Sequence, residues 1–567
     1  MTGTMRGIGK RIVRRDSVSP IDCESPLLGR LFAARGLESV IELDHSLRGL
    51  LPPSGLRGIH EAAEIVATAI EAESTILIVG DFDADGATSC ALLVSSLKAM
   101  GVVSVSYLVP DRFKFGYGLS PEIVQVAAEF GPDLLVTVDN GISSQAGVAL
   151  ANNTGMQVII TDHHLPGAEL PAAAAIVNPN QPDCHFESKH LAGVGVAFYL
   201  LSAVRAELRA RGWFDSRTEP NLAEWLDLVA LGTIADVVQL DQNNRRLVSE
   251  GLRRIRAGRA RPGLNALIEI AGLDRANLLT RDLAFSIAPR LNAAGRLQDM
   301  TLGIECLLAT GSRAEELAYH LDELNKERRD IERNMRDEAL EVIDALSLEG
   351  EKSAGLCLYR SNWHEGVVGI IASRIKEWTY RPAIAFAPVS NGELKGSGRS
   401  VAGFHLRDAL DALATENPGL LLRFGGHAMA AGLSIKEADF DRFCHAFNNQ
   451  VTRVLGNAGL EQVVTTDGSL DEEITLEIAR LLELAAPWGQ GFSEPQFDDD
   501  FEVLEQRILG GSHLKLLLQP SRGQPVDAIC FNHPGLLEAR HIHCVYRIEV
   551  NRYRGREQPQ LVVLLFA

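Results

Sequence analysis

Three aspartates directly follow one short apolar run in the sequence. Ile76-Leu-Ile-Val79 is typical of a buried strand, and Asp81, Asp83 and Asp85 come just after it. In an extended segment such alternate residues lie on one side, so their charges repel one another unless a cation lies among them. The spacing therefore indicates a site for a divalent metal ion.

An EF-hand is the first alternative, because Asp-x-Asp-x-Asp-Gly also opens that calcium-binding loop. The twelfth position of an EF-hand loop is a bidentate Glu, and a helix precedes the loop. Counted from Asp81, the twelfth residue is Leu92, and the preceding run is strand-like. These two differences exclude an EF-hand.

Further acids and histidines follow later apolar runs. Residues 76–109 have a strand, helix, strand order, with the helix expected over Thr88–Met100, which predicts a parallel sheet. The carboxyl ends of parallel strands share one edge, where ligands bind. We therefore expect the side chains that follow Leu134–Val138, Val158–Ile160 and Leu226–Ile234 to join the first acids at that edge, namely Asp139, Asp162, His163, His164 and Asp236.

This set of ligand types points to a particular chemistry. Carboxylates with one or two imidazoles suit Mn²⁺ or Mg²⁺ better than zinc, which favours nitrogen and sulfur. So many acids favour two ions about 3.5–4 Å apart that share a bridging carboxylate. Two such ions serve phosphoester hydrolysis, because they activate a water and neutralise charge on the phosphate.

Composition limits the class of protein. The chain has 567 residues and eight scattered cysteines, so we expect three or four domains at ~150 residues each, and reduced thiols. Neither a membrane-spanning run nor a signal peptide is recognisable, so we expect a cytoplasmic protein with no membrane partner. A net charge of −19 argues against nonspecific coating of duplex DNA but permits a local basic groove. The arginine-rich residues 245–261 are either such a groove or a solvated helix face.

Patterning divides the chain into five segments. Residues 1–55 are weakly patterned, residues 56–300 form the first α/β domain, and residues 301–350 hold a long helix from about Ala314 to Leu348. Residues 351–457 form a second α/β domain with two glycine-rich turns, at 396–400 and 424–428. Residues 460–567 carry about five short strands, typical of a small β-barrel such as an oligonucleotide-binding (OB) fold. The predicted fold class is therefore two α/β lobes joined by a long helix, with a C-terminal barrel.

The motifs together resemble a known superfamily. Asp81-x-Asp-x-Asp-Gly86, Asp139-Asn-Gly141, Asp162-His-His164 and Asp236 occur in the order of the four motifs of the DHH phosphoesterases. Gly425-Gly-His-Ala-Met-Ala-Ala-Gly432 resembles the signature of the DHH-associated (DHHA1) substrate-binding domain. The C-terminal β-region and two segments, Pro289–Arg296 and Trp363–Gly369, narrow the resemblance to the RecJ exonucleases.

The resemblance implies an activity and roles for the motif residues. RecJ exonucleases degrade single-stranded DNA from the 5′ end, with Mn²⁺ or Mg²⁺, in recombination and repair. By the resemblance, Asp162 orients an imidazole, His164 lies near the scissile phosphate, and the metal ligands are Asp81, Asp83, Asp85, Asp139, His163 and Asp236.

Substrate contacts are expected mainly in the second lobe. Glycines let backbone N–H groups approach a phosphate, so Gly425 and Gly426 are candidates together with Ser397, Arg399 and His427. Tyr117 or Phe115 is expected to stack on a base. The resemblance adds four positions along the DNA path, which are Arg112, Arg290, Arg296 and His364.

Family precedent also implies a monomer, with single-stranded DNA bearing a 5′ end as substrate and with single-strand-binding protein and a RecQ-type helicase as partners. Two rival functions are a DHH phosphodiesterase acting on short oligonucleotides or cyclic dinucleotides, and a non-catalytic DNA-binding scaffold. The C-terminal β-region weighs against the first rival, and the complete set of acids weighs against the second.

Overall fold

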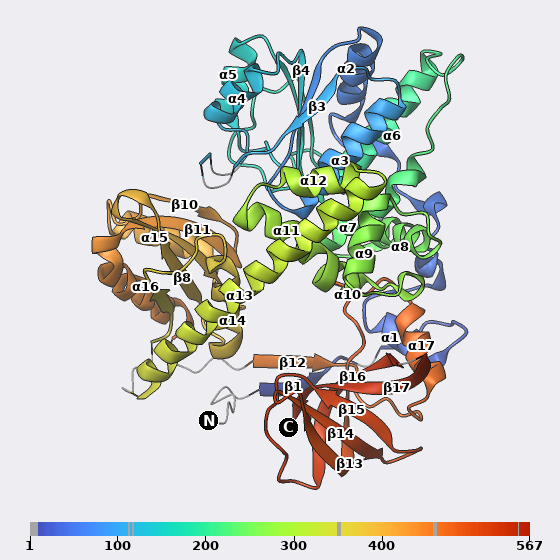
Figure 1. The fold of residues 1–567 in the computed structure, drawn as a ribbon, viewed down its shortest axis with the longest axis vertical. Coiled ribbons are helices and arrows are strands. Elements are labelled where there is room, and N and C mark those ends of the chain that lie inside the picture. Colours follow the sequence, from blue (N-terminus) through green and yellow to red (C-terminus); the bar gives the residue numbers. More distant parts are fainter. Residues whose placement is uncertain are drawn as a thin grey trace.

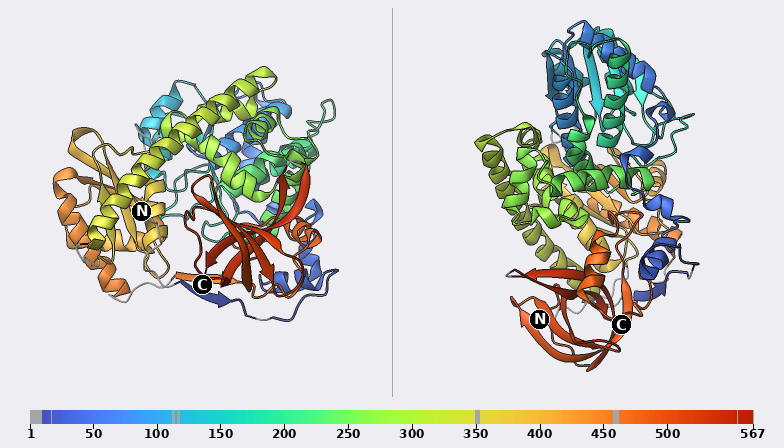
Figure 2. Two further views of the ribbon diagram at one scale, coloured as in Figure 1. Left: turned by 60° about the horizontal axis from the view of Figure 1, so that its bottom comes forward. Right: turned by 90° about the vertical axis from the view of Figure 1, so that its right-hand side faces the viewer.

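The computed structural model describes residues 10–16, 18–111, 114–115, 118–348, 353–456, 462–553 and 555–566. Figure 1 shows a first lobe with a helical base, a second lobe beside that base, and a β-barrel below. The yellow-green helix that runs between the two lobes is prominent in Figure 2. Among the described helices, none combines the length and the apolarity needed to cross a membrane.

The first lobe is built on a five-stranded parallel sheet of order β3-β2-β4-β5-β6. Its strands are β2 (Ile76–Val79), β3 (Val105–Leu108), β4 (Leu134–Val138), β5 (Gln157–Thr161) and β6 (Ala175–Val177). The next two strands along the chain, β3 and β4, lie on opposite sides of β2. The strand order therefore reverses at β2, and ligands bind at such a switch point. The predicted parallel sheet is confirmed.

Helices cover both faces of this sheet, which explains why its strands are apolar throughout. Ile76 and Ile78 of β2 pack in one core with α2 (Ile59–Glu71), α3 (Ala84–Ala99) and α6 (Gly193–Ala210). Leu77 and Val79 pack on the other face, with α4 (Pro121–Ala128) and α5 (Gln145–Asn153). Alternate side chains of one strand therefore enter two different cores.

A helical region forms the base of the first lobe. It comprises α7 (Leu226–Ala235), α8 (Gln242–Arg256), α9 (Pro262–Ile270), α10 (Thr280–Asp282), α11 (Ala288–Leu297) and α12 (Thr301–Leu308). The basic run at 245–261 lies here, and much of it is neither a DNA groove nor a solvated face. Arg245 is buried over the Phe492 ring, and Arg261 pairs with Asp227 at 3.0 Å. These arginines fix the packing of α8 and α9.

The predicted connecting helix is confirmed as α13 (Ser312–Leu348), which is 37 residues long. At 1.5 Å per residue it spans about 55 Å. Leu317 and Leu321 pack in the core of the first lobe, whereas Met335 and Ala339 pack against α14 (Val368–Thr379) of the second lobe. One helix therefore contributes to two separate cores.

The second lobe contains a mixed sheet of order β10-β11-β9-β8-β7. Its strands are β7 (Leu356–Tyr359), β8 (Ala383–Pro388), β9 (Glu393–Arg399), β10 (Arg423–Gly426) and β11 (Ala430–Lys436). Helix α14 covers one face, and α15 (Leu406–Glu416) and α16 (Phe440–Leu455) cover the other.

The glycine-rich turn predicted at 396–400 is wrong, because residues 396–399 belong to β9, whereas the one predicted at 424–428 is half correct, because residues 424–426 belong to β10 and His427 begins the connection to β11. Close packing explains the glycines of β9. A Cβ atom would approach the Phe386 ring to 2.5 Å at Gly396, and the Leu406 side chain to 2.8 Å at Gly398.

The C-terminal region forms the predicted closed barrel, of order β13-β14-β15-β17-β16. The strands are β13 (Phe497–Leu509), β14 (His513–Pro520), β15 (Val526–Cys530), β16 (His541–Tyr553) and β17 (Arg556–Phe566). Two of them have 13 residues each, so the expectation of short strands is wrong. Helix α17 (Leu476–Leu484) packs on the barrel core.

The N-terminal segment packs with the barrel, although the two are far apart in the sequence. Strand β1 (Lys10–Arg14) pairs in parallel with β12 (Gln462–Thr466), as Figure 1 shows at the foot of the molecule. Leu27 and Leu31 of α1 (Pro26–Ala33) enter the barrel core. The weakly patterned start of the chain therefore helps to hold the barrel in place.

Candidate active site

The loop that follows β2 turns at once into a helix. Helix α3 begins at Ala84, earlier than predicted, because the Asp83 carboxylate caps it by accepting hydrogen bonds from the amides of Asp85 (2.9 Å) and Gly86 (3.1 Å). The three acids therefore do not share one extended segment. A side chain at Gly86 would approach the Asp81 carbonyl oxygen to 2.4 Å, so the turn requires glycine.

The Asp85 carboxylate binds the N-terminus of α6. The Gly193 amide donates to Oδ2 at 2.6 Å and the Val194 amide to Oδ1 at 3.0 Å, where the helix dipole favours negative charge. A Cβ atom at Gly193 would lie 2.5 Å from Asp139 Cβ, so glycine lets α6 approach both acids. Gly193 was not predicted. The available signal was the glycine pair Gly193 and Gly195 at the start of an apolar run.

Asp139, Asp236 and His163 meet although they come from three separate elements. His163 Nε2 lies 3.0 Å from Asp139 Oδ1 and 3.4 Å from Asp236 Oδ2. Asp139 directly follows β4 and has a left-handed backbone with φ of 61°, and Asp236 is the C-cap of α7. Asp236 was expected to join the other acids after the apolar run Leu226–Ile234, and it reaches the site from the end of helix α7, which that run forms.

The predicted ligands approach one another closely enough to hold metal ions in three overlapping groups. Within each group the ligand atoms lie within 4.8 Å of one another. The groups are Asp81 with Asp83 and Asp139, Asp85 with His163 and Asp236, and Asp139 with His163 and His164. Asp139 belongs to two of these groups, so its carboxylate would be available to an ion in either one.

Burial and mutual repulsion shape the charges of this cluster. Burial raises the pKa of Asp85 to about 7, with the charge of Asp83 adding to the effect. Burial and the charge of Asp85 raise the pKa of Asp139 and of Asp236 well above the usual range. Burial also lowers the pKa of His163 to about 4, which keeps its imidazole neutral. Without a metal ion, the three carboxyl groups therefore hold protons more tightly than free carboxyl groups do, and His163 offers a neutral nitrogen.

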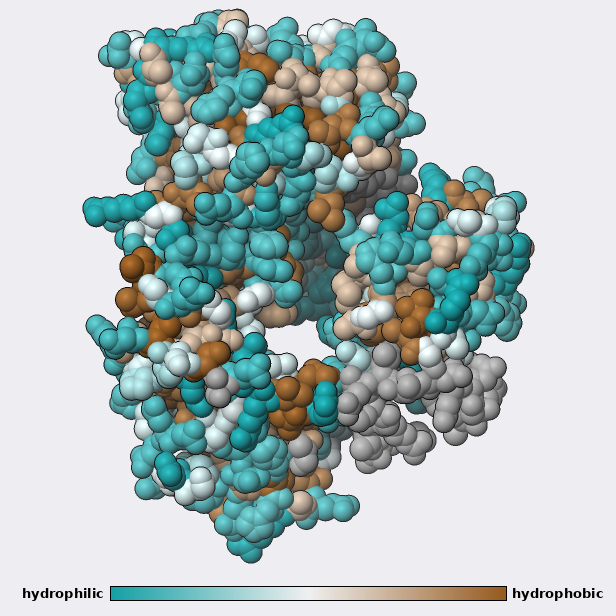
Figure 3. Space-filling model, turned by 180° about the vertical axis from the view of Figure 1, so that it is seen from behind, coloured by the Kyte–Doolittle hydropathy of each residue, from teal (hydrophilic) through white to brown (hydrophobic). Residues whose placement is uncertain are grey.

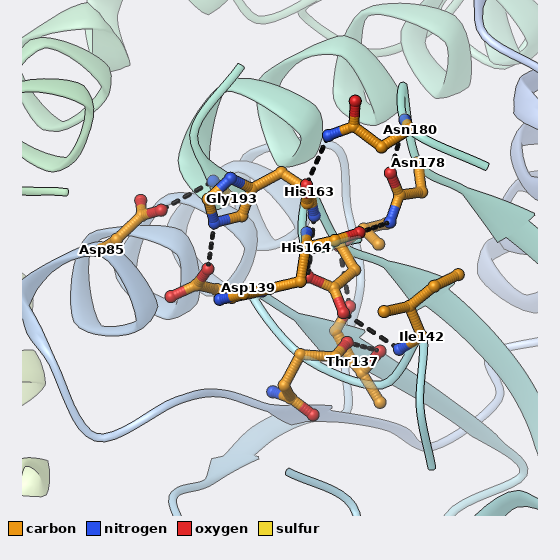
Figure 4. A network of polar contacts seen from close by, with 12 residues as sticks. Asp85, Thr137, Asp139, Ile142, His163, His164, Asn178, Asn180 and Gly193 are labelled. Carbon is orange, nitrogen blue, oxygen red and sulfur yellow. Dashed lines mark hydrogen bonds and ion pairs between the residues drawn. The ribbon is translucent and has the colours of Figure 1, made fainter. Parts of the chain in front are cut away.

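Asp162 organises the pair of histidines that follows it, His163 and His164, which Figure 4 shows within a network of polar contacts. Its Oδ1 accepts from the His163 amide (2.7 Å) and the His164 amide (3.1 Å), and its Oδ2 accepts from the Ile142 amide (2.9 Å). The ring of His164 approaches through Nδ1 at 2.7 Å. Burial alone would lower the pKa of His164, but its bond to Asp162 raises the pKa above its usual value. The contact between the two side chains therefore favours the charged form of each.

The second lobe reaches this cluster through His427. Its ring lies 6.1 Å from the ring of His164, at an interplanar angle of 27°. Gly426 in β10 has φ of 138°, and a Cβ there would approach the Ala430 carbonyl oxygen to 2.4 Å. The neighbouring Gly425 has open space around its Cα. The predicted residues of β10 thus lie across from the histidines of the first lobe.

Ser397 and Arg399 lie side by side on β9. Arg399 Nη1 donates to Ser397 Oγ at 3.0 Å and to the Gly398 carbonyl at 2.8 Å, and burial lowers the Arg399 pKa. A Cβ atom at Gly369 would lie 3.1 Å from Ser397 Oγ and 3.2 Å from Arg399 Nη2. Both side chains therefore face the first turn of α14, where the helix dipole favours an anion.

The other described residues predicted along the DNA path make contacts within the protein. Arg296 donates to the Gly366 carbonyl at 3.1 Å, and His364 Nδ1 accepts from the Gly366 amide at 3.0 Å. Arg290 is buried and pairs with Asp322 at 2.9 Å, so it is held between α11 and α13. Arg112 and Tyr117 lie outside the described residues.

Helix α11 also supports the first acidic loop, a role that was not predicted. Asn292 Oδ1 accepts from the Ala84 amide at 2.8 Å. A Cβ atom at Gly295 would lie 2.0 Å from the Phe82 carbonyl oxygen. The Pro289–Arg296 motif therefore positions the loop that carries Asp81 and Asp83.

Comparison with known proteins gives a consistent result along the chain. The DHH family N-terminal domain matches residues 75–233, the DHHA1 domain matches residues 352–453, and the RecJ OB domain matches residues 466–564. The single-stranded-DNA-specific exonuclease RecJ of Dickeya dadantii is 54% identical over 547 residues, which cover 95% of each chain. This chain belongs to the RecJ family. Its RecJ relative from Escherichia coli is 52% identical, again over 95% of each chain.

Solved RecJ structures share the fold. The crystal structure of RecJ with Mn²⁺ from Thermus thermophilus has a TM-score of 0.82 at 32% identity, and covers 99% of this chain and 79% of that one. The structure with Mg²⁺ from the same organism has a TM-score of 0.75 at 30% identity, and covers 98% and 78%.

The donor set of this RecJ chain fits Mn²⁺ or Mg²⁺. Carboxylate oxygens dominate it, and such hard ligands favour these ions over zinc. His163 Nε2 and Asp236 Oδ2 are buried without a hydrogen-bond partner among the described residues. Buried polar atoms are normally satisfied, so these two atoms fit a cation that both would ligate.

In this RecJ protein, the metal-free form is expected to lose stability as the pH rises from 3.8 through about 7. Over that range the unfolded chain releases protons that the raised pKa values of Asp85, Asp139 and Asp236 retain in the folded state. Since the folded state then binds more protons, the free energy of unfolding falls with pH.

Urea unfolding in EDTA and in Mn²⁺ at several pH values measures this effect. Mn²⁺ competes with the protons, so the stabilisation that it gives should grow with pH. An equal gain from Mn²⁺ at about pH 5.5 and about pH 8 would contradict the raised pKa values.

Proposed function

We propose that this chain is a single-stranded-DNA-specific exonuclease that releases mononucleotides from the 5′ end with two Mn²⁺ or Mg²⁺ ions, in DNA recombination and repair. The observation that carries the proposal is the convergence of carboxylates and one imidazole from four separate segments to within ligand distance of one another. Relatives that are 54% and 52% identical over nearly the whole chain bear the name of that activity.

The residues of the cluster divide into two ligand sets. Asp81, Asp83 and Asp139 would hold one ion, and Asp85, His163 and Asp236 would hold the other. Bound there, the ions supply an activated water and neutralise charge on the phosphate. The protein contributes ligands that are fixed in advance by the Asp83 cap, by the α6 amides and by α11.

His164 is proposed to act directly on the scissile phosphate. The Asp162 carboxylate raises the pKa of the His164 imidazole, which favours its charged form, and orients the ring through Nδ1. A charged Nε2–H donates a hydrogen bond to a phosphate oxygen or a proton to the leaving oxygen. Burial lowers the pKa of His427, whose ring lies 6.1 Å from that of His164, and the charge of His164 adds to the effect, so the neutral form of His427 is favoured there.

Ser397 and Arg399 are proposed to hold the 5′-terminal phosphate. Arg399 places its guanidinium beside a serine hydroxyl and the first turn of α14, three groups that favour an anion. With that phosphate fixed in the second lobe and the ions in the first, the scissile bond is the first one from the 5′ end. This arrangement would make cleavage exonucleolytic.

Replacing Arg399 with alanine is expected to remove the preference for a 5′-phosphate. The wild-type protein should degrade a 5′-phosphorylated strand about tenfold faster or more than a 5′-hydroxyl strand at limiting substrate, because a buried charge-assisted contact is worth about 1.5–3 kcal/mol. Arg399→Lys is the matched control, since it keeps the charge but loses the fork of donors. An unchanged preference in Arg399→Ala would remove this role.

The arrangement of the three parts supports the preference for a single strand. Figure 3 shows an opening between the first lobe, the second lobe and the barrel. The 5′ end is proposed to lie between the lobes, and the barrel is proposed to hold the following nucleotides by stacking and by contacts with the backbone. A duplex would have to separate before its end reached the ions.

The decisive experiment uses end-labelled single-stranded DNA with Mn²⁺ and, separately, with EDTA. Metal-dependent release of mononucleotides from the 5′ end is the expected result. Binding without cleavage would favour the scaffold, and cleavage restricted to short oligonucleotides or cyclic dinucleotides would favour the phosphodiesterase. Duplex DNA of the same sequence is the control for strand preference.

We also propose a cytoplasmic monomer that works with a single-strand-binding protein and a RecQ-type helicase. An enzyme limited to single strands needs a partner that opens duplexes and one that keeps the strands apart. Size measurement in solution tests the oligomeric state, and stimulation of nucleotide release from a duplex by a helicase tests the partnership.

A further inference from the structure

A cavity of about 370 Å³ lies between the helical base of the first lobe and the chain that leads from α17 to the barrel. Its walls come from the last turn of α7, from α10, from the π-helical turn Leu283–Ile287 and from parts of residues 483–494. Most of the lining is apolar and includes Ile234, Val238, Leu252, Leu279, Ala284 and Trp488. A cavity of this size and character fits a flat organic group.

Among the described charged side chains that line the cavity, Arg256 is the one whose guanidinium can donate to a ligand. Arg281 contacts Glu494 at 3.0 Å and Glu549 at 2.9 Å, and Glu483 pairs with Arg552 at 2.8 Å. Arg256 donates from Nε to the Leu278 carbonyl at 2.8 Å, and within the described part of the chain its guanidinium has no ion pair. Its terminal nitrogens therefore favour a neutral or anionic acceptor, because a guanidinium only donates.

Two exposed apolar side chains, Phe285 and Val237, line this cavity. Phe285 is 76% exposed and Val237 is 63% exposed, although both are large and hydrophobic. Val237 also has φ of 61°, a strained conformation for a β-branched residue. Backbone strain and π-helical turns both concentrate at functional sites. An exposed phenyl ring beside an apolar cavity offers a stacking surface.

The cavity adjoins the metal cluster through α7. Asp236 at the end of that helix reaches the cluster, and the next residue, Val237, lines the cavity. In Figure 1 α10 lies between the first lobe and the barrel. A strand that runs from the cluster toward the barrel therefore has this cavity beside its path.

We propose that the cavity binds one nucleobase of the single-stranded substrate on the 3′ side of the scissile phosphate. Phe285 stacks on the strand at the mouth, and Arg256 donates to an acceptor on the edge of the inserted base. The base then anchors the strand between the ions and the barrel. This inference rests on the proposed exonuclease function.

The test scans 5′-phosphorylated oligonucleotides that each carry one abasic site at a successive position from the 5′ end. For the wild-type protein, the Kd in EDTA and the rate of first cleavage in Mn²⁺ are expected to worsen about tenfold at one position beyond the first phosphodiester. In Phe285→Ala and in Arg256→Met the intact strand should bind more weakly, while the strand that lacks this base should bind as it does to the wild type.

Phe130→Ala is the matched control, since it also removes an exposed phenyl ring, at 44% exposure, from a turn that does not line the cavity. The proposal would be overturned if the wild-type Kd and cleavage rate were the same for every abasic position. It would also be overturned if the abasic site weakened binding to both cavity variants as much as it does to the wild type, or if Phe130→Ala weakened binding of the intact strand as the cavity variants do. Failure of the exonuclease function would be seen separately, as no nucleotide release by the wild type from the unmodified strand, and the Kd scan would still test the base site.

Discussion

Replacing Asp139 with asparagine is expected to lower kcat by more than about 10³-fold and yet to stabilise the metal-free protein. The carboxylate is 2% exposed and lies in two of the three ligand groups. Burial and the charge of Asp85 raise its pKa well above the usual range, so without metal it destabilises the fold at neutral pH. Asparagine keeps the shape and removes the ionisable group whose proton uptake costs stability, but it would be a poorer ligand for cations.

Nucleotide release and thermal unfolding together measure this prediction. In EDTA the Tm of Asp139→Asn should exceed that of the wild type, by about 2–4 °C for each 1 kcal/mol gained. Added Mn²⁺ should raise the Tm of the wild type much more than that of the variant. Asp411→Asn, on the exposed face of α15, is the control. A wild-type response to Mn²⁺ in Asp139→Asn would show that Asp139 is not a ligand.

The strands that carry the acids were predictable because they are buried on both faces. A continuous apolar run such as Leu134–Val138 has few other interpretations when a turn follows it, and the structure places β4 over the same residues. Parallel strands deliver their following residues to one edge, so Asp81, Asp139 and His163 were expected to meet. The local pattern and the fold agree here.

Contacts that depend on tertiary packing were not predictable. Asp236 follows an apolar run in the same way as Asp139 does, yet that run is the buried helix α7, because periodicity cannot distinguish a fully buried helix from a strand. Gly396 and Gly398 suggested a turn, but they make room for the Phe386 and Leu406 side chains within a sheet. The neighbours that decide such cases are distant in the sequence.

Buried arginines were the least predictable feature. Arg290 belongs to a motif associated with the DNA path, but its partner Asp322 lies one helical layer away on α13. Arg245 reads as part of a basic surface, but it packs on Phe492 from the segment that leads into the barrel. A charge run gives the composition of a helix and not the face that it turns to the protein.

Replacing Asp162 with asparagine is expected to cost about 3–5 kcal/mol of stability and about 10²-fold in kcat. The carboxylate is fully buried and accepts from three backbone amides and from the ring of His164. Asparagine has one acceptor oxygen where the carboxylate has two, and its NH₂ group would face one of these N–H donors. That buried N–H would then have no acceptor. His164 would also lose the bond that keeps its pKa raised, and burial would then favour the neutral ring.

Urea unfolding measures the loss of stability, and the pH dependence of kcat at saturating Mn²⁺ separates the two effects. A purely structural defect lowers kcat by the same factor at every pH. Loss of the His164 charge instead makes the deficit smaller at low pH, where the ring regains its proton. Asp183→Asn is the control, because that carboxylate is 85% exposed and its ion pair with Arg57 lies at the surface, where such pairs contribute little. A deficit in Asp162→Asn that does not change with pH would show that Asp162 supports the fold of the loop without setting the charge of His164.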